Sequence, residues 1–199
     1  MHAAGADYPA TLTCEPAEKV ANWRAIGNPI LAIPHLVIAS VLGQVSEVIS
    51  VISWFAIVFT GRLPQGLANF QAMYVRYYAR ALVYAGFLRE EYPQFAFAMT
   101  PDDPGDDSRV RVDFRPELEN RNRVTTAFRL ILAIPHLLVL ALLGIAMFFV
   151  VLIAVFAVLF TGQWPGALRE FALGVGRWSI RVTAYLTLLT DEYPPFSLE

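Results

Sequence analysis

Two pairs of arginines in otherwise apolar sequence are the residues best suited to bind an anion. Arg76 and Arg80 are four positions apart, and Arg177 and Arg181 repeat that spacing. Residues four apart share one face of a helix, and guanidinium groups bind phosphate and carboxylate oxygens in a planar, bidentate manner. The spacing therefore predicts a site for anionic lipid head groups or for another anion. The alternative is that each arginine anchors an interfacial helix by extending its charged end to water.

Glu47 is the only acidic residue in the apolar run from 29 to 60. It belongs to a polar stripe along one helix face, together with Ser40, Gln44 and Ser50. If the chain folds back at the turn after residue 60, Glu47 comes level with Arg80. We therefore predict a buried Glu47–Arg80 ion pair, because an unpaired charge in apolar surroundings is costly. A proton or ion relay is the alternative use of the same two groups.

Two histidines occupy the same place in a repeated hexapeptide, LAIPHL, at 31–36 and 132–137. No carboxylate or thiol stands at ligand spacing beside His35 or His136, so we predict no metal site. We expect both histidines at the membrane–water interface, together with Tyr92 and Tyr193, because tyrosine concentrates at that depth. The sequence has no glycine-rich phosphate loop, no Ser–His–Asp spacing and no paired carboxylates. We therefore predict no catalytic residue, no cofactor and no enzyme activity.

The composition places these residues in a membrane protein. Hydrophobic residues make up 56% of the 199, the mean hydropathy is +0.49, and charged residues are 16%, against about 25% in soluble domains. The net charge of −2 gives no basic excess for binding nucleic acid. The single cysteine, Cys14, excludes an intramolecular disulfide. We expect membrane lipids as partners, with another membrane protein or a second copy of the chain as the protein partner.

The chain is an internal duplication with an offset of 101 positions. Laying residues 20–95 on 121–196 without a gap gives 26 identities in 76 positions, including the arginines and histidines above. A period this long indicates two domain-sized copies rather than a solenoid. We divide the chain into an N-terminal tail at 1–19, a first membrane repeat at 20–95, a linker at 96–120 and a second membrane repeat at 121–199.

Each copy has the pattern of a helical hairpin. An apolar run predicts a spanning helix near 35–60 and near 136–161, about 25 residues or roughly 37 Å long. Pro34 and Pro135 predict a short interfacial helix before each span. A turn containing glycine and proline then leads to a less apolar helix, near 66–90 and near 167–191. We predict an all-α integral membrane protein of two tandem hairpins with four spans. The alternative is that the second helix of each copy lies in the interface.

Basic residues orient the predicted hairpins. Nine lie in the N-terminal tail, in the linker and where the repeats open and close, whereas the two turns inside the hairpins carry only Arg62 and Arg169. This bias places both termini and the linker in the cytoplasm, in a multi-pass protein of the inner membrane of the cell. The alternating segment RVRVDF at 109–114 and the segment ATLTC at 10–14 predict two strands that pair as a small cytoplasmic ribbon.

The combined pattern resembles a bacterial membrane-protein family named domain of unknown function 4389. The resemblance covers both copies, through IPHL, FTG followed by proline, the spaced arginines with a later tyrosine, and EYP followed by phenylalanine. The second copy is closer to the pattern, because in the first a tyrosine replaces a tryptophan and Gln94 replaces a proline. The resemblance implies an integral membrane protein and no established activity.

The expected function follows from the arginines and from the lack of catalytic groups. We expect a non-enzymatic scaffold or accessory subunit that binds anionic head groups through the four arginines. The alternative is a small oligomeric transport module that uses Glu47 and the same arginines.

Overall fold

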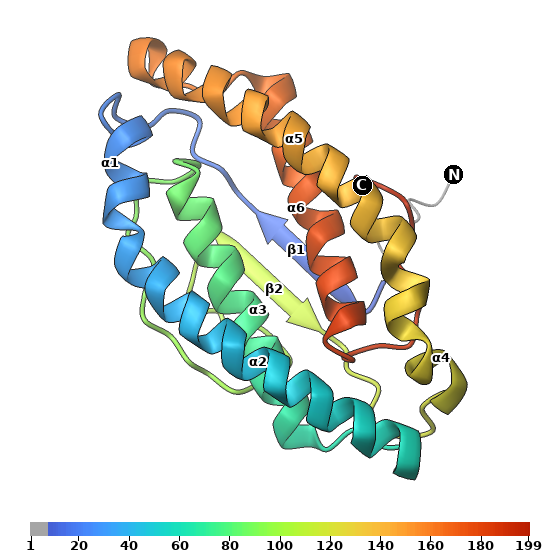
Figure 1. The fold of residues 1–199 in the computed structure, drawn as a ribbon. Coiled ribbons are helices and arrows are strands. Elements are labelled where there is room, and N and C mark those ends of the chain that lie inside the picture. The colour runs from blue at the N-terminus through green and yellow to red at the C-terminus, as the bar shows by residue number, and fades with distance from the viewer. Residues whose placement is uncertain (1–7) are drawn as a thin grey trace.

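The computed structural model describes residues 8–199 as six helices and two short strands (Figure 1). Each copy contributes a short helix and two longer helices, and a strand precedes each copy, β1 in the N-terminal tail and β2 in the linker. The elements are β1 (Ala10–Cys14), α1 (Arg24–Leu31), α2 (Ile33–Thr60), α3 (Gln65–Ala85), β2 (Val110–Phe114), α4 (Arg123–Ala127), α5 (Arg129–Thr161) and α6 (Gly166–Leu186).

A glycine ends the first long helix of each copy. Gly61 and Gly162 follow α2 and α5 with φ of 71°, in the left-handed region that favours glycine. Pro64 and Pro165 come next and directly precede α3 and α6. Because proline cannot continue the preceding helix, the chain reverses direction there. As a result α3 packs along α2, and α6 packs along α5.

The two strands form an antiparallel ribbon in which Leu12 is opposite Val112. Val110 and Val112 are fully buried, whereas Thr13 and Arg111, which are paired across the ribbon, are exposed. This alternation gives the ribbon an apolar inner face and a polar outer face. The ribbon predicted from the sequence is confirmed, in a protein that is otherwise mostly helical.

The two copies exchange contacts with each other. β1 precedes the first copy but packs on α6 of the second, while β2 packs on α3 of the first. In the same way α1 packs on α5, and α4 packs on α2. Two hydrogen bonds mark these equivalent contacts: the Asn22 amide donates to the Leu159 carbonyl at 2.8 Å, and the Trp54 indole donates to the Thr126 carbonyl at 3.0 Å. The copies are therefore related by an approximate two-fold axis.

The elements are arranged in layers (Figure 1). The ribbon lies behind α3 and α6 in this view and packs on both of them. α2 and α5 run antiparallel to each other along the outer sides of α3 and α6, on the side turned away from the ribbon. The molecule therefore has a ribbon side and a long-helix side.

Among residues 8–199, α2 and α5 are long and apolar enough to cross a membrane, judged by length and composition. The structure therefore contains two candidate spans, whereas the sequence predicted four. α3 and α6 end at Ala85 and Leu186, about five residues earlier than predicted, because Phe87 and Leu188 adopt left-handed φ angles of 47° and 67° that stop each helix. A short helix precedes each long one, α1 and α4, but the break predicted at Pro135 is wrong, because this proline lies inside α5.

Candidate functional site

The arginine pair of the first copy extends from α3 to the ribbon and the linker. Arg76 and Arg80 are at most 4% exposed. Arg80 donates to both oxygens of the Asp103 carboxylate, at 2.9 and 3.0 Å, and pairs with Asp106 at 2.8 Å. Arg76 donates to backbone carbonyls, among them that of Val112 at 3.1 Å. These bonds hold the linker against α3 and occupy the guanidinium groups with oxygens of the protein itself.

The arginine pair of the second copy binds the C-terminal segment instead. Arg181 is 2% exposed and donates to the carbonyl of Glu199 at 2.7 Å and to that of Ser197. Arg177 is half-buried and lies 3.5 Å from the carbonyl of Leu198. Backbone oxygens thus take the place that the linker carboxylates have in the first copy. All four arginines predicted to bind an anion contact the protein's own oxygens.

The predicted Glu47–Arg80 ion pair is wrong. Arg80 is paired with the linker aspartates, and Glu47 is exposed on the surface of α2. Its neighbours Ser46 and Ser50 face α3, where the Gln71 amide donates to the Ser46 carbonyl at 2.9 Å and to the Ser50 hydroxyl at 3.0 Å. The sequence argument compared only the two helices of one hairpin, and it did not consider that the linker could bring carboxylates to the opposite face of α3.

His136 is enclosed by aromatic side chains from α6 and from the DEYPPF motif. Its ring stacks on Phe196 with a centroid distance of 4.0 Å, and Tyr193 lies at 4.7 Å. The indole N–H of Trp178 donates to Nδ1 at 3.3 Å. Because an indole can only donate, Nδ1 is the acceptor and the neutral ring carries its proton on Nε2. The histidine thus joins α5, α6 and the closing motif.

His35 has the same surroundings in the first copy. Its ring stacks on Phe95 at 4.2 Å, Tyr92 lies at 4.8 Å, and the Tyr77 hydroxyl is 2.8 Å from Nδ1. Both histidines are buried inside the protein, His35 at 1% and its counterpart at 0% exposure, and their position at the membrane–water interface stays a prediction. Tyr92 and its counterpart at 193 are each 43% exposed at the edge of the cage. The repeated histidine and EYP motifs are therefore explained by packing, and residues 8–199 hold no group of three or more potential ligands placed to bind a metal ion.

Two further clusters fix the chain where each hairpin closes. Arg89 binds Asp107 at 2.5 Å, and Arg121 binds Asp191 at 2.6 Å, with Arg129 on the same Asp191 oxygen. Burial raises the pKa of both carboxyls, but the arginine hydrogen bonds and donating backbone N–H groups outweigh burial and hold each pKa below its ordinary value. Both aspartates are therefore charged at neutral pH.

The largest unpartnered surface belongs to α2 and α5. Their buried residues form one narrow stripe facing α3 and α6, and most of the remaining surface is apolar, although α2 also exposes Ser40, Gln44 and Glu47. Exposed hydrophobic side chains recur every three or four residues, at one face of each helix. On α2 they are Val37, Val41, Val45, Val48, Ile52, Phe55 and Phe59, and on α5 they are Leu138, Leu142, Ile145, Phe149, Leu152, Phe156 and Phe160. A continuous apolar surface of this length is unusual for a soluble monomer.

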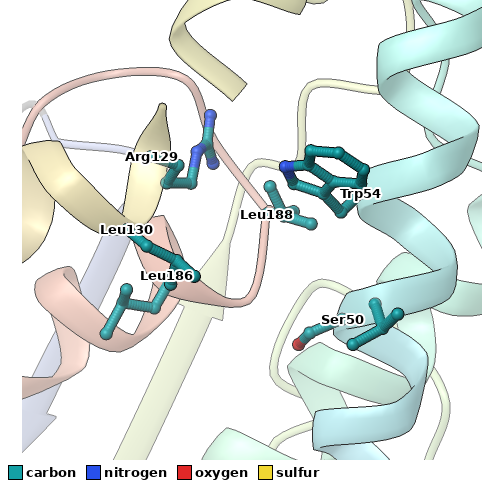
Figure 2. A pocket seen from close by; sticks show the side chains of 7 residues that line it. Ser50, Trp54, Arg129, Leu130, Leu186 and Leu188 are labelled. Atoms are coloured by element: carbon teal, nitrogen blue, oxygen red, sulfur yellow. The ribbon is translucent and has the colours of Figure 1, made fainter. Parts of the chain in front are cut away.

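A pocket of about 250 Å³ lies between α2 and the place where α5 begins and α6 ends (Figure 2). Ser50 and Trp54 line it from α2, and Arg129 and Leu130 from α5. Val51, Leu186 and Leu188 complete the lining. No sequence signal marks this pocket, because its residues come from three separated segments.

Together these observations define a duplicated repeat protein whose copies exchange contacts and expose a long apolar helix each. The chain belongs to the family described as domain of unknown function 4389, which matches residues 28–97 and 123–197. The two matched segments agree with the duplication found in the sequence. No curated protein and no solved structure matches the chain.

Proposed function

We propose that this protein is a membrane-attached scaffold in which α2 and α5 lie flat in one leaflet of a bilayer. The observation that carries the proposal is the contrast between the two sides of the molecule. The long-helix side exposes apolar side chains over the length of both helices, interrupted on α2 by Ser40, Gln44 and Glu47, while the ribbon side exposes polar and charged residues such as Thr13 and Arg111. Helices with one apolar face are buried about 5–10 Å into the boundary between head groups and acyl chains.

The packing of α3 favours an in-plane position over a spanning one. α3 follows α2 along its length, since Gln71 contacts Ser46 and Tyr77 contacts His35. The charged ribbon and linker pack on the other side of α3. If α2 crossed the hydrocarbon, these charges would lie at the same depth, and a charged side chain there costs about 2.5–3.5 kcal/mol or more.

The approximate two-fold symmetry fits this orientation. With the axis along the membrane normal, α2 and α5 have equivalent depths although they run antiparallel. Residues 8 and 199 are then both on the ribbon side. The Tyr8 hydroxyl donates to the carbonyl of Glu192, and Arg181, on the helix that β1 packs against, donates to the main-chain oxygen of Glu199. This side is the cytoplasmic side in our proposal.

Single cysteines distinguish three possible topologies. In a chain with Cys14 replaced by serine, we would place one cysteine at Gly66, Gly166 or Arg111 and label intact cells and inverted vesicles with an impermeant maleimide. Open space surrounds both glycines, so a side chain is tolerated there. In-plane helices predict that all three positions react from one side. Reaction of both glycine positions from the side opposite Arg111 would establish four spans, and reaction of the two glycine positions from opposite sides would establish two.

Membrane attachment is tested with a matched pair of substitutions. Val48→Asp places a charge on the exposed apolar face of α2, where Val48 is 60% exposed. Thr13→Asp places the same charge on the exposed face of the ribbon. The first change should release the protein from floated vesicles, and the second should not. Equal flotation of both variants would contradict the proposed membrane face.

A further inference from the structure

The two histidine cages differ in one hydrogen-bonding group. In the second copy, the indole N–H of Trp178 donates to Nδ1 of His136 at 3.3 Å. In the first copy, the hydroxyl of Tyr77 lies 2.8 Å from Nδ1 of His35. An indole can only donate, whereas a hydroxyl can donate or accept. Tyr77 can therefore bond to a neutral or to a protonated histidine, and Trp178 can bond only to a neutral one.

Protonation of His136 would set two donors against each other. A charged imidazole carries hydrogen on both ring nitrogens, so its Nδ1–H would point at the indole N–H of Trp178. The other ring nitrogen, Nε2, is buried and has no hydrogen-bond partner among residues 8–199. The charged ring would thus lose one hydrogen bond and gain none, in a cage where it is 0% exposed. Because a buried charge without hydrogen bonds is costly, protonation favours a ring outside the cage.

The aromatic side chains around His136 carry no charge that could balance the proton. Phe196 stacks on its ring with a centroid distance of 4.0 Å, and Tyr193 lies at 4.7 Å. Trp178 meets the ring edge-on at 5.8 Å. The cage is therefore built from three uncharged rings, one from α6 and two from the segment that follows it.

The charged groups nearest to this cage have other partners. Arg129, on the same helix as His136, lies over the ring of Tyr185 at 4.4 Å and is itself a cation. Asp191 is bound by Arg129 and by a second arginine, and Glu192 is exposed. Burial accordingly lowers the pKa of His136 below its ordinary value of 6.5.

The C-terminal segment, residues 193–199, forms one wall of the cage. Two of its rings contact the histidine, although Phe196 is 55% and Tyr193 is 43% exposed. Farther along, its main-chain oxygens accept hydrogen bonds from Arg181. Because both rings are already partly exposed, moving this segment away would open the cage without unfolding α5 or α6.

We infer that the second cage is an acid-sensitive closure, in which a proton on His136 releases the C-terminal segment from α5 and α6. The equivalent segment of the first copy, residues 92–98, stays in place, because Tyr77 can accept a hydrogen bond from protonated His35. A released histidine takes up its proton near the ordinary pKa of 6.5, and the enclosed one only at lower pH. Release therefore becomes more favourable as the pH falls below 6.5. This inference does not depend on membrane attachment.

The test follows one fluorinated ring in each cage. The full chain in detergent carries 4-trifluoromethylphenylalanine in place of Phe196 or, as the matched probe, in place of Phe95, and its ¹⁹F resonance is recorded from pH 7.5 to 5.0. Both rings stack on a histidine, at 4.0 and 4.2 Å, so both resonances report on closure. The probe at 196 should shift towards its position in the urea-unfolded chain, and the probe at 95 should not. Constant circular dichroism at 222 nm would separate release from unfolding.

Exchanging the two donors is the control for the mechanism. Trp178→Tyr gives the second cage the hydroxyl of the first, so the probe at 196 should no longer shift with pH. Tyr77→Trp should make the probe at 95 acid-sensitive. Equal shifts of both probes in the chain with its own donors, or no shift of either, would overturn the inference without any exchange. A shift at 196 that Trp178→Tyr leaves unchanged would overturn it as well.

Discussion

Arg80→Gln should destabilise the protein strongly, although Arg80 contacts neither the apolar face nor the pocket. Its side chain is 5% exposed and binds the fully buried carboxylate of Asp103 through two hydrogen bonds. Glutamine is shorter than arginine and uncharged, so it cannot replace the Arg80 Nη2 group, which donates to both carboxylate oxygens. The substitution therefore leaves the buried Asp103 carboxylate with Arg76 alone, whose Nε lies 3.6 Å from Oδ2, and it also removes the cation paired with Asp106.

The expected magnitude follows from that geometry. Removing one partner of a buried ion pair costs about 3–5 kcal/mol. For chains of 150–250 residues each kcal/mol lowers Tm by about 2–4 °C, so the expected loss is about 6–20 °C. Arg181→Gln, the equivalent change in the second copy, should cost less, because Arg181 binds main-chain oxygens of the C-terminal segment rather than a fully buried side-chain carboxylate.

The assay is thermal unfolding followed by circular dichroism at 222 nm, in the same detergent for every variant. Glu47→Gln is the control, since Glu47 is exposed and its change should stay within about 0.5 kcal/mol. The double variant Arg80→Gln/Glu47→Gln should show additive losses within about 0.5 kcal/mol. A Tm loss below 3 °C for Arg80→Gln, or a double variant more stable than Arg80→Gln alone, would refute this account of the arginine.

Three other substitutions test separate parts of the fold. The pKa of Asp107 is lower in the folded protein than its ordinary value of 3.8. The stability that the charged carboxyl contributes is therefore fully present above pH 3.8 and is lost as the pH falls through the folded pKa. Asp107→Asn should flatten the acid limb of a stability–pH profile below about pH 4. His136→Phe keeps the aromatic stacking but leaves the Trp178 indole N–H without its acceptor, so Tm should fall by the equivalent of about 1–3 kcal/mol, and adding Trp178→Phe should restore part of it. Gly162→Ala should lower Tm, because φ is 71° and a Cβ would lie 2.7 Å from a backbone oxygen. Gly66→Ala, where a helical position has open space around it, should instead raise stability by up to about 1 kcal/mol. Equal Tm changes for the two variants would contradict this reasoning.

The sequence predicted the parts of the fold that depend on local pattern. The duplication, the long apolar helices, the turns at Gly61 and Gly162, and the two ribbon strands each have a signal within a few residues. Alternation at 109–114 was sufficient to identify β2, because a strand with one buried face must alternate. The ends of α3 and α6 were placed too late, since no local signal marks the left-handed residues Phe87 and Leu188.

The surroundings of the charged residues could not be predicted in the same way. Arg80 was assigned to Glu47 because the two helices of a hairpin are the nearest elements in sequence. Its true partner, Asp103, lies in a linker whose path depends on the packing of the whole ribbon. The aromatic surroundings of the histidines have no local signal either, because the three aromatic neighbours of His136 are between 42 and 60 residues away.

The exchanged contacts between the copies also determine how much of the chain can fold on its own. A polypeptide with one copy would have a strand and a short helix but would lack the α6 or α5 surface on which each packs. Two such polypeptides could supply these surfaces to each other reciprocally, with the same patch on both subunits, as in an isologous dimer. An excised half of this chain should therefore fold only at concentrations that support dimerisation. Pairing of β1 with β2, which brings together residues about 100 positions apart, is expected to form late in folding because of the long loop that it closes.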